Sequence, residues 1–161
     1  MFYRRHLLGA LAGPVSQNKV RLLFGARQTG KTALLARLLR GPETVVYGLE
    51  DTRLRRRFEV DAGAFGREVR ALPPAIRNVL VDEVQKVPAL LEEVQGLYDE
   101  APARHQFFLT GSSARRLRAR SSNLLPGRAH VFHLFPVMHW EADAEPARGW
   151  PWSRPSTEPG P

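Results

Sequence analysis

Residues 25–32 of the chain read Gly25-Ala26-Arg27-Gln28-Thr29-Gly30-Lys31-Thr32. The run matches the pattern G-x-x-x-x-G-K-[ST] of a phosphate-binding loop at every fixed position. In such a loop a glycine-rich turn directs backbone N–H groups at a phosphate, and the N-terminus of the following helix adds its positive dipole end. Lys31 would then contact the β- and γ-phosphates of a nucleotide, and the Thr32 hydroxyl would be a ligand of Mg²⁺. The alternative is a chance match in an ordinary turn.

The segments beside this run favour the first interpretation. An apolar strand candidate, Val20–Phe24, precedes it, and the helical pattern of Lys31–Arg40 follows until Gly41-Pro42 ends it. Helical patterns also separate four more short apolar segments, which is typical of an α/β fold with a parallel sheet covered on both faces. The sequence therefore predicts a three-layer sandwich of the P-loop NTPase type, with the further strands at 44–47, 79–81, 106–109 and 130–134.

Two acidic residues follow the apolar segment Val79–Val81. A strand that ends in a carboxylate places Asp82 at the carboxyl end of the sheet, where a phosphate loop also lies. There Asp82 would hold the Mg²⁺ shell, and Glu83 would take a proton from an attacking water, which separates hydrolysis from binding alone. The alternative is an ordinary strand with a polar end.

A further helical segment and strand follow the acidic pair, which suggests the additional-strand class of P-loop ATPases. In that class an extra strand lies between the two motif strands and ends in a polar residue facing the γ-phosphate. Thr110 or Ser112 would fill this sensor position, and Thr110 is favoured because it directly follows Phe107-Phe108-Leu109. A turn in which Ser112 or Ser113 caps a helix is the alternative.

Arginines suggest two further roles. Arg128 is a candidate arginine finger, which in a homo-oligomer would reach the γ-phosphate of a neighbouring copy. A solvated surface position is the alternative. Two other groups of arginines could follow a DNA or RNA backbone, although solvated helix faces explain them as well. The groups are Arg53, Arg55, Arg56 and Arg57, and Arg115, Arg116, Arg118 and Arg120.

The bulk composition describes one soluble globular domain. The 161 residues are 43% hydrophobic and 25% charged, and no apolar run is long enough to span a membrane. The absence of cysteine excludes disulfides and Cys-based zinc sites. The net charge of +8 favours an anionic partner, yet only three of the 24 basic residues are Lys, a bias that GC-rich coding DNA would also produce.

The two ends of the chain differ from its middle. Basic residues precede a short apolar run in Met1–Ala12, but the run is too brief for a persuasive signal peptide, and we expect a cytoplasmic location. Five prolines fall within Glu145–Pro161, and neither helical nor strand periodicity persists there. We therefore expect one domain over 1–144 and a Pro-rich tail over 145–161 that is disordered or marks a truncation.

These motifs together resemble a family of bacterial and archaeal AAA+-type ATPases of uncertain biological role, in which a C-terminal domain of unknown function usually follows. The resemblance covers Phe2–Glu141. The Arg-Gln within the phosphate loop and the Gln-Lys after the acidic pair are its more specific features. It rests on Gly25–Thr32, Asp82–Pro88, Leu109–Ser113 and Leu125–Arg128, on Tyr47–Asp51, and on Phe135-Pro136 through Glu141.

The resemblance implies a five-stranded parallel sheet, with ATP and Mg²⁺ as ligands. The chain departs from the family at Pro126, where Ala is more frequent, and at the Pro-rich tail that stands where a second domain would begin. The leading hypothesis is a Mg²⁺-dependent ATPase module. The alternatives are a nucleotide-gated nucleic-acid-binding module with little turnover, and a truncated fragment that binds ATP without physiological activity.

Overall fold

The computed structural model describes residues 7–13, 18–112 and 127–136. Its centre is a sheet of five strands, all parallel, in the order β2-β3-β4-β1-β5. The predicted five-stranded parallel sheet is confirmed, and β4 lies between β1 and β3, the place predicted for an additional strand. The strands are β1 (Val20–Phe24), β2 (Thr44–Gly48), β3 (Asn78–Asp82), β4 (Gln106–Gly111) and β5 (Ala129–His133).

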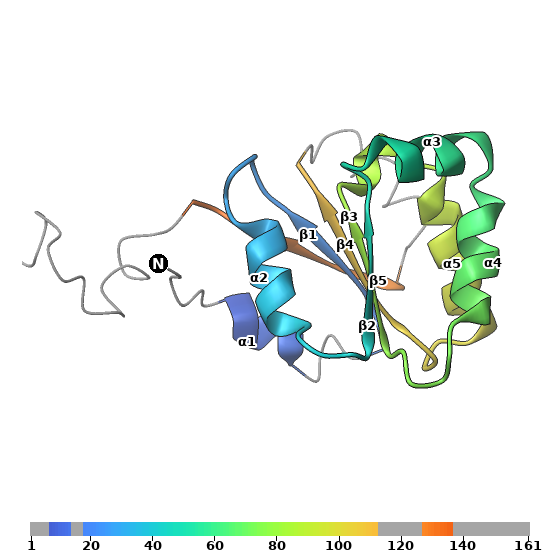
Figure 1. Ribbon diagram of the computed structural model, residues 1–161. Coiled ribbons are helices and arrows are strands. Elements are labelled where there is room, and N and C mark those ends of the chain that lie inside the picture. The colour runs from blue at the N-terminus through green and yellow to red at the C-terminus, as the bar shows by residue number, and fades with distance from the viewer. Residues whose placement is uncertain (1–6, 14–17, 113–126, 137–161) are drawn as a thin grey trace, which may run out of the picture.

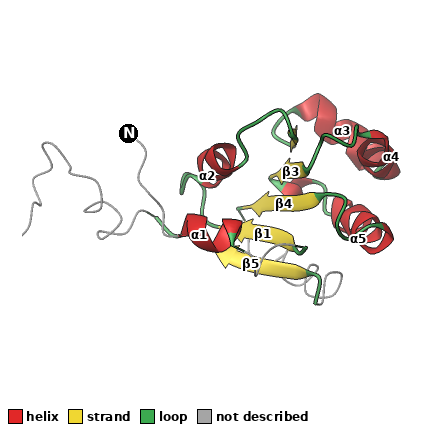
Figure 2. Ribbon diagram, turned by 90° about the horizontal axis from the view of Figure 1, so that it is seen from below, coloured by secondary structure: helices red, strands yellow, loops and turns green. Residues whose placement is uncertain are grey.

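Helices cover both faces of this sheet (Figures 1 and 2). One face carries α1 (Leu7–Ala12) and α2 (Lys31–Leu38), and the other carries α3 (Thr52–Val60), α4 (Gly63–Ala71) and α5 (Leu90–Glu100). A short 3₁₀ turn, η2 (Val84–Lys86), joins β3 to the segment before α5. No helix in the described part of the chain is long and apolar enough to cross a membrane.

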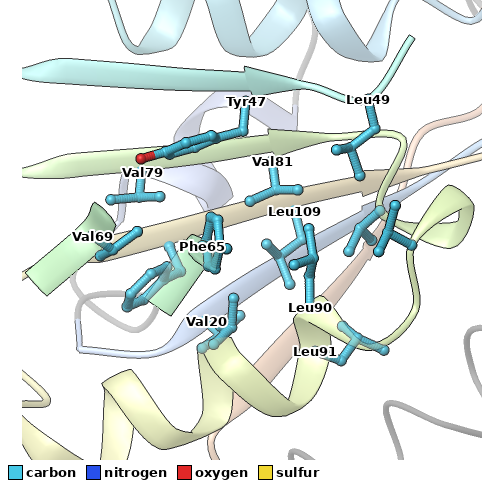
Figure 3. Close-up of a cluster of buried hydrophobic side chains, with 14 of the residues drawn as sticks. Val20, Tyr47, Leu49, Phe65, Val69, Val79, Val81, Leu90, Leu91 and Leu109 are labelled. Atoms are coloured by element: carbon cyan, nitrogen blue, oxygen red, sulfur yellow. The ribbon is translucent and has the colours of Figure 1, made fainter. Parts of the chain in front are cut away.

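Each face of the sheet has its own hydrophobic cluster, because the side chains of a strand alternate between its two faces. On β1, Leu22 and Phe24 pack toward α3–α5, whereas Leu23 packs toward α1 and α2. Figure 3 shows part of the larger cluster, in which the rings of Tyr47 and Phe65 meet edge to face at 5.0 Å. The central strands β1, β3 and β4 are buried on both faces, which explains why their sequences are mostly apolar without polar alternation.

Some element bounds differ from the expectations. Helix α2 ends two residues early, at Leu38, because the chain leaves helical geometry at Leu39 and turns at Gly41 (φ 140°) before Pro42. Strand β4 continues to Gly111, since Thr110 and Gly111 still pair with Leu23 and Phe24 of β1. The short helix α1 was not predicted at all. The predicted basic helix at 113–120 and the Pro-rich tail lie outside the described residues.

The sheet has two distinct ends. Because all strands are parallel, they share a carboxyl end and an amino end, and these two terms are used below in that sense. Register sets which residues meet at the carboxyl end: Leu23 and Leu109 lie opposite Thr110 and Val81, respectively. Thr110 of β4 therefore lies beside Asp82, the last residue of β3.

Candidate active site at the carboxyl end of the sheet

The loop of residues 25–32 joins β1 to α2 at the carboxyl end. Gly25 has no room for a side chain, because a Cβ there would lie 2.4 Å from the Leu134 carbonyl oxygen and 2.9 Å from Thr29 Oγ1. Gly30, directly before α2, has a φ of 86°, in the left-handed region that glycine adopts without strain. Steric constraints thus explain why glycine occupies both fixed glycine positions of the motif.

The side chain of Lys31 lies inside this loop. Only 5% of the residue is exposed, and its Nζ donates hydrogen bonds of 2.9 Å to the carbonyl oxygens of Gly25 and Ala26. Thr29 Oγ1 closes the turn with a bond of 2.9 Å to the same Ala26 oxygen. The ammonium group is therefore held next to the first N–H groups of α2, which have no partners within the helix. A buried cation beside such N–H groups makes a binding place for an anion.

Three side chains meet between α2, β3 and β4. Thr32 Oγ1 lies 3.2 and 3.0 Å from the two carboxylate oxygens of Asp82, and the Thr110 hydroxyl donates to Asp82 Oδ1. Asp82 is 9% exposed and Thr110 is fully buried, whereas Thr32 is exposed. Buried Thr110 thus holds the Asp82 carboxylate from inside the fold, and the contact with Thr32 links the same carboxylate to the phosphate loop.

Hydroxyl and carboxylate oxygens are the ligands that Mg²⁺ takes from proteins, together with phosphate oxygens and waters. Thr32 and Asp82 present such oxygens about one hydrogen-bond length apart, beside the anion-binding loop. The donor set therefore fits a Mg²⁺ ion carried by a nucleotide, with Thr32 and Asp82 as the residues that would hold it.

Glu83 follows Asp82 in an unusual backbone conformation. Its φ of 60° and ψ of 46° lie in the left-handed region, which is costly for a residue with a side chain. Its backbone N–H donates to Thr110 Oγ1 at 2.9 Å, and its Oε2 accepts from Ser112 Oγ at 3.0 Å. Gln28 in the phosphate loop also has a positive φ, of 63°. Non-glycine residues held in this region often mark functional sites.

Three basic side chains, one of them from the phosphate loop, act on Glu50. Lys86 in η2 forms an ion pair of 2.5 Å with Glu50, which follows β2. The hydrogen bond from Lys86, and then the charges of Lys86, Arg27 and Arg55, lower the pKa of Glu50. Arg27 of the phosphate loop is thus close enough to lower the pKa of Glu50, which is already paired with Lys86. This concentration of cations suits a ligand with several negative charges.

The structure brings together most of the residues that the sequence singled out. Lys31, Thr32, Asp82, Glu83 and Thr110 all lie at the carboxyl end, linked by the contacts above. The donor and the acceptor of Thr110 serve Asp82 and the Glu83 backbone inside the fold. Ser112, the other sensor candidate, is partly exposed and contacts the Glu83 carboxylate. The sensor role of either residue stays a prediction.

Arg128 lies at the other end of the sheet. It directly precedes β5, and its carbonyl oxygen accepts from the N–H of Val20 at the start of β1. Its Nε forms an ion pair of 2.6 Å with Asp99, which raises the pKa of Arg128. Arg128 is therefore remote from the phosphate loop of its own chain. Its action on a neighbouring copy stays a prediction.

The arginine cluster on α3 is partly neutralised. Arg55 pairs with Glu59 at 3.5 Å, and Arg57 pairs with Glu68 of α4. These contacts fit the interpretation of solvated helix faces rather than a continuous basic track. The second cluster, at 115–120, lies outside the described residues.

Two residues of the site received no role from the sequence. Gln85 Nε2 contacts both Glu83 Oε2 and Ser112 Oγ, and Gly111 packs against the Gln85 side chain. The Gln-Lys pair after the acidic residues stood out as a family-specific feature, and this was the only available signal. The hydrogen bonds of Gln85 depend on the turn η2, which the order of residues alone does not show.

Comparison with solved structures supports the fold. PCH-2 of C. elegans matches with a TM-score of 0.53 and 20% identity, covering 82% of this chain and 38% of that one. The Pif1 helicase of Candida albicans matches with a TM-score of 0.51 and 14% identity, covering 89% of this chain and 42% of that one. At these identities the likeness concerns the fold alone.

Sequence comparison points to a family. Uncharacterized proteins of Mycobacterium tuberculosis and Mycobacterium bovis are each 27% identical to this chain over 131 residues. The aligned region is 81% of this chain but only 28% of the length of these relatives. A family model described as "AAA domain" matches residues 17–142, which include every element from β1 to β5. The chain belongs to this AAA domain family, and it is a nucleotide-binding module of the ATPase type.

Proposed function

We propose that the chain binds ATP with Mg²⁺ at the carboxyl end of the sheet and hydrolyses it. The observation that carries the proposal is the contact chain from the phosphate loop to the acidic pair. Lys31 is held inside the loop, Thr32 touches Asp82, and Thr110 links Asp82 to Glu83. These contacts join α2, β3 and β4 around one place, beside a helix N-terminus that favours anions.

In this proposal each residue has a distinct task. The ammonium group of Lys31 offsets negative charge on the β- and γ-phosphates, and the loop N–H groups orient them. Thr32 and Asp82 hold the Mg²⁺, which supplies further charge neutralisation. Glu83 accepts a proton from the water that attacks the γ-phosphorus, so that ADP and inorganic phosphate leave. Thr110 keeps Asp82 and the Glu83 backbone in place.

Phosphate release from the purified chain tests the proposal. Glu83→Gln removes the base while it preserves the size and shape of the side chain and one acceptor oxygen. We expect turnover to fall roughly 10²- to 10⁴-fold, the usual contribution of a general base, with ATP affinity retained.

The matched control is Glu92→Gln, which changes an exposed carboxylate in the first turn of α5. This variant should hydrolyse ATP at the rate of the original chain. Equal phosphate release from the original chain and from Glu83→Gln would remove Glu83 from the mechanism.

A further inference from the structure

The side chain of Gln85 lies between the acidic pair and the end of β4. Its Nε2 donates to Glu83 Oε2 and also to Ser112 Oγ, at 2.9 Å. Ser112 Oγ in turn donates to Glu83 Oε2 at 3.0 Å. The amide, the hydroxyl and the carboxylate thus form a closed triangle. We refer to Glu83, Gln85 and Ser112 as the carboxylate clamp.

Both donors of the clamp meet the same carboxylate oxygen. Within the described part of the chain, no hydrogen bond is made to the other oxygen of Glu83, Oε1. One oxygen is therefore anchored while the second is left to accept a proton. A carboxylate held at one oxygen has little freedom to rotate, and this is a requirement for an efficient base.

The orientation of the Gln85 amide is costly to the fold. Its Oε1 is buried and has no hydrogen-bond donor among the residues that the structure describes. Turning the amide would give Oε1 a donor in Ser112 but would place it against a carboxylate oxygen, which repels it. The observed orientation therefore gives the Glu83 carboxylate a hydrogen-bond donor and leaves the Gln85 amide oxygen without one.

Gly111 provides the space for this arrangement. A Cβ at Gly111 would lie 3.0 Å from Gln85 Oε1 and 3.4 Å from the ring of Phe24. The Gly111 carbonyl oxygen also accepts the N–H of Gly25, the first residue of the phosphate loop, at 3.3 Å. The end of β4 thus contacts the clamp on one side and the phosphate loop on the other.

We propose that Gln85 is a positioning residue for ATP hydrolysis, which fixes Glu83 against Ser112 so that Glu83 Oε1 faces the attacking water. This inference rests on the proposed function. It adds a set of hydrogen bonds that holds the general base, Glu83, against Ser112 after the end of β4. Gln85 itself touches neither the phosphates nor the reacting water. It acts through the orientation of the carboxylate.

The test measures kcat and KM for ATP hydrolysis, the Kd of a fluorescent ATP analogue, and thermal stability. Gln85→Ala and Ser112→Ala each remove a donor to Glu83 Oε2, and Ser112→Thr restores the hydroxyl. The matched control is Gln95→Ala, which removes a half-buried glutamine side chain from α5. A second set of variants combines Gln85→Ala with Glu83→Gln.

We expect Gln85→Ala to lower kcat roughly 10- to 100-fold, the size of a misplaced catalytic group, while the Kd stays unchanged. Ser112→Ala should follow in the same direction, and Ser112→Thr should recover most of the loss. In the Glu83→Gln background, Gln85→Ala should cause no further loss, because the group that it positions is already inactive.

Other outcomes separate this inference from the proposed function. An original chain that neither binds nor hydrolyses ATP overturns both. An active chain in which Gln85→Ala keeps its kcat, or lowers it equally with and without Glu83, overturns the positioning role and leaves the ATPase proposal standing. A parallel rise in Kd and loss of stability would mean that Gln85 supports the fold instead.

Discussion

The two ends of the same sheet are built in different ways. At the carboxyl end, Glu83 and Gln28 adopt left-handed backbone conformations, and Lys31 and Asp82 are buried with their charges. At the amino end, the prominent charged contact in the described residues is the pair of Arg128 and Asp99, whose side chains are both about one-third or more exposed. The strained backbone lies at the carboxyl end together with buried Lys31 and Asp82, whereas toward the amino end the described residues combine exposed ion pairs with one buried cation, Arg21.

A third residue with positive φ sharpens this contrast. Asn18, at the amino end, has a φ of 60°, but asparagine tolerates this region far better than glutamate or glutamine. Its carbonyl oxygen accepts a hydrogen bond of 2.6 Å from Tyr98, an ordinary packing contact. The costly conformations thus fall at the carboxyl end, where the proposed chemistry takes place. Substitutions at this end should affect nucleotide handling, and those at the amino end should affect stability alone.

The largest effect should follow from Gly25→Ala. The new methyl group would meet the Leu134 backbone, so the loop or β5 must shift. We expect a loss of about 1–3 kcal/mol in the free energy of unfolding together with a loss of measurable ATP binding. Denaturant unfolding and calorimetric titration measure the two quantities.

The matched control for this prediction is Gly96→Ala in α5, where a Cβ would have nothing within 4 Å. This variant should gain about 0.5–1 kcal/mol, because alanine favours a helix interior, and it should bind ATP normally. Normal ATP binding by Gly25→Ala would show that the loop tolerates a different shape.

A smaller, purely structural effect should come from His105, which precedes β4 at the amino end and is 6% exposed. Burial, followed by the charge of Arg104, lowers the pKa of His105. A group whose pKa is lower in the folded state contributes stability above its unfolded pKa, and this stability is lost as the pH falls. Unfolding followed from pH 7.5 downward should therefore show declining stability below about pH 6.5. His105→Gln should flatten that decline, and an unchanged slope would contradict the assignment.

The smallest effect should come from Arg128→Ala. The ion pair with Asp99 is exposed, and such pairs contribute little to stability. We expect a slight fall in melting temperature and an unchanged ATP affinity. A turnover that rises with concentration in the original chain and loses this rise in the variant would establish the arginine finger acting between copies, and equal turnover of both chains at all concentrations would remove that role.

Much of the fold and half of the site could be predicted because their signals are local. The motif at 25–32 encodes its own turn through Gly25 and Gly30, and apolar runs mark the strands. The position of Asp82 follows from one further rule, that parallel strands share a carboxyl end. The same rule would have placed Arg128 at the amino end, since it precedes a predicted parallel strand.

The remaining features depend on tertiary contacts. The contacts of Thr110 are set by register, which puts it beside Asp82 and next to the Glu83 backbone N–H. The role of Gln85 arises only when η2 turns its side chain back toward Glu83. Thr110 meets residues of another strand, and Gln85, although only two residues after Glu83, reaches Glu83 and Ser112 only because η2 turns it there, so the residue types alone do not reveal either contact.

The central claim is that Lys31 and the loop around it bind the phosphates of ATP. Isothermal calorimetry with Mg²⁺-ATP tests this on Lys31→Ala beside Lys19→Ala, because the two lysines flank the opposite ends of β1 and both contact backbone carbonyl oxygens. We predict that Lys31→Ala weakens binding roughly 10- to 100-fold, the value of a charge-assisted contact, and that Lys19→Ala leaves it unchanged. Equal affinity in both variants and the original chain, or no binding by the folded original chain, would contradict the account.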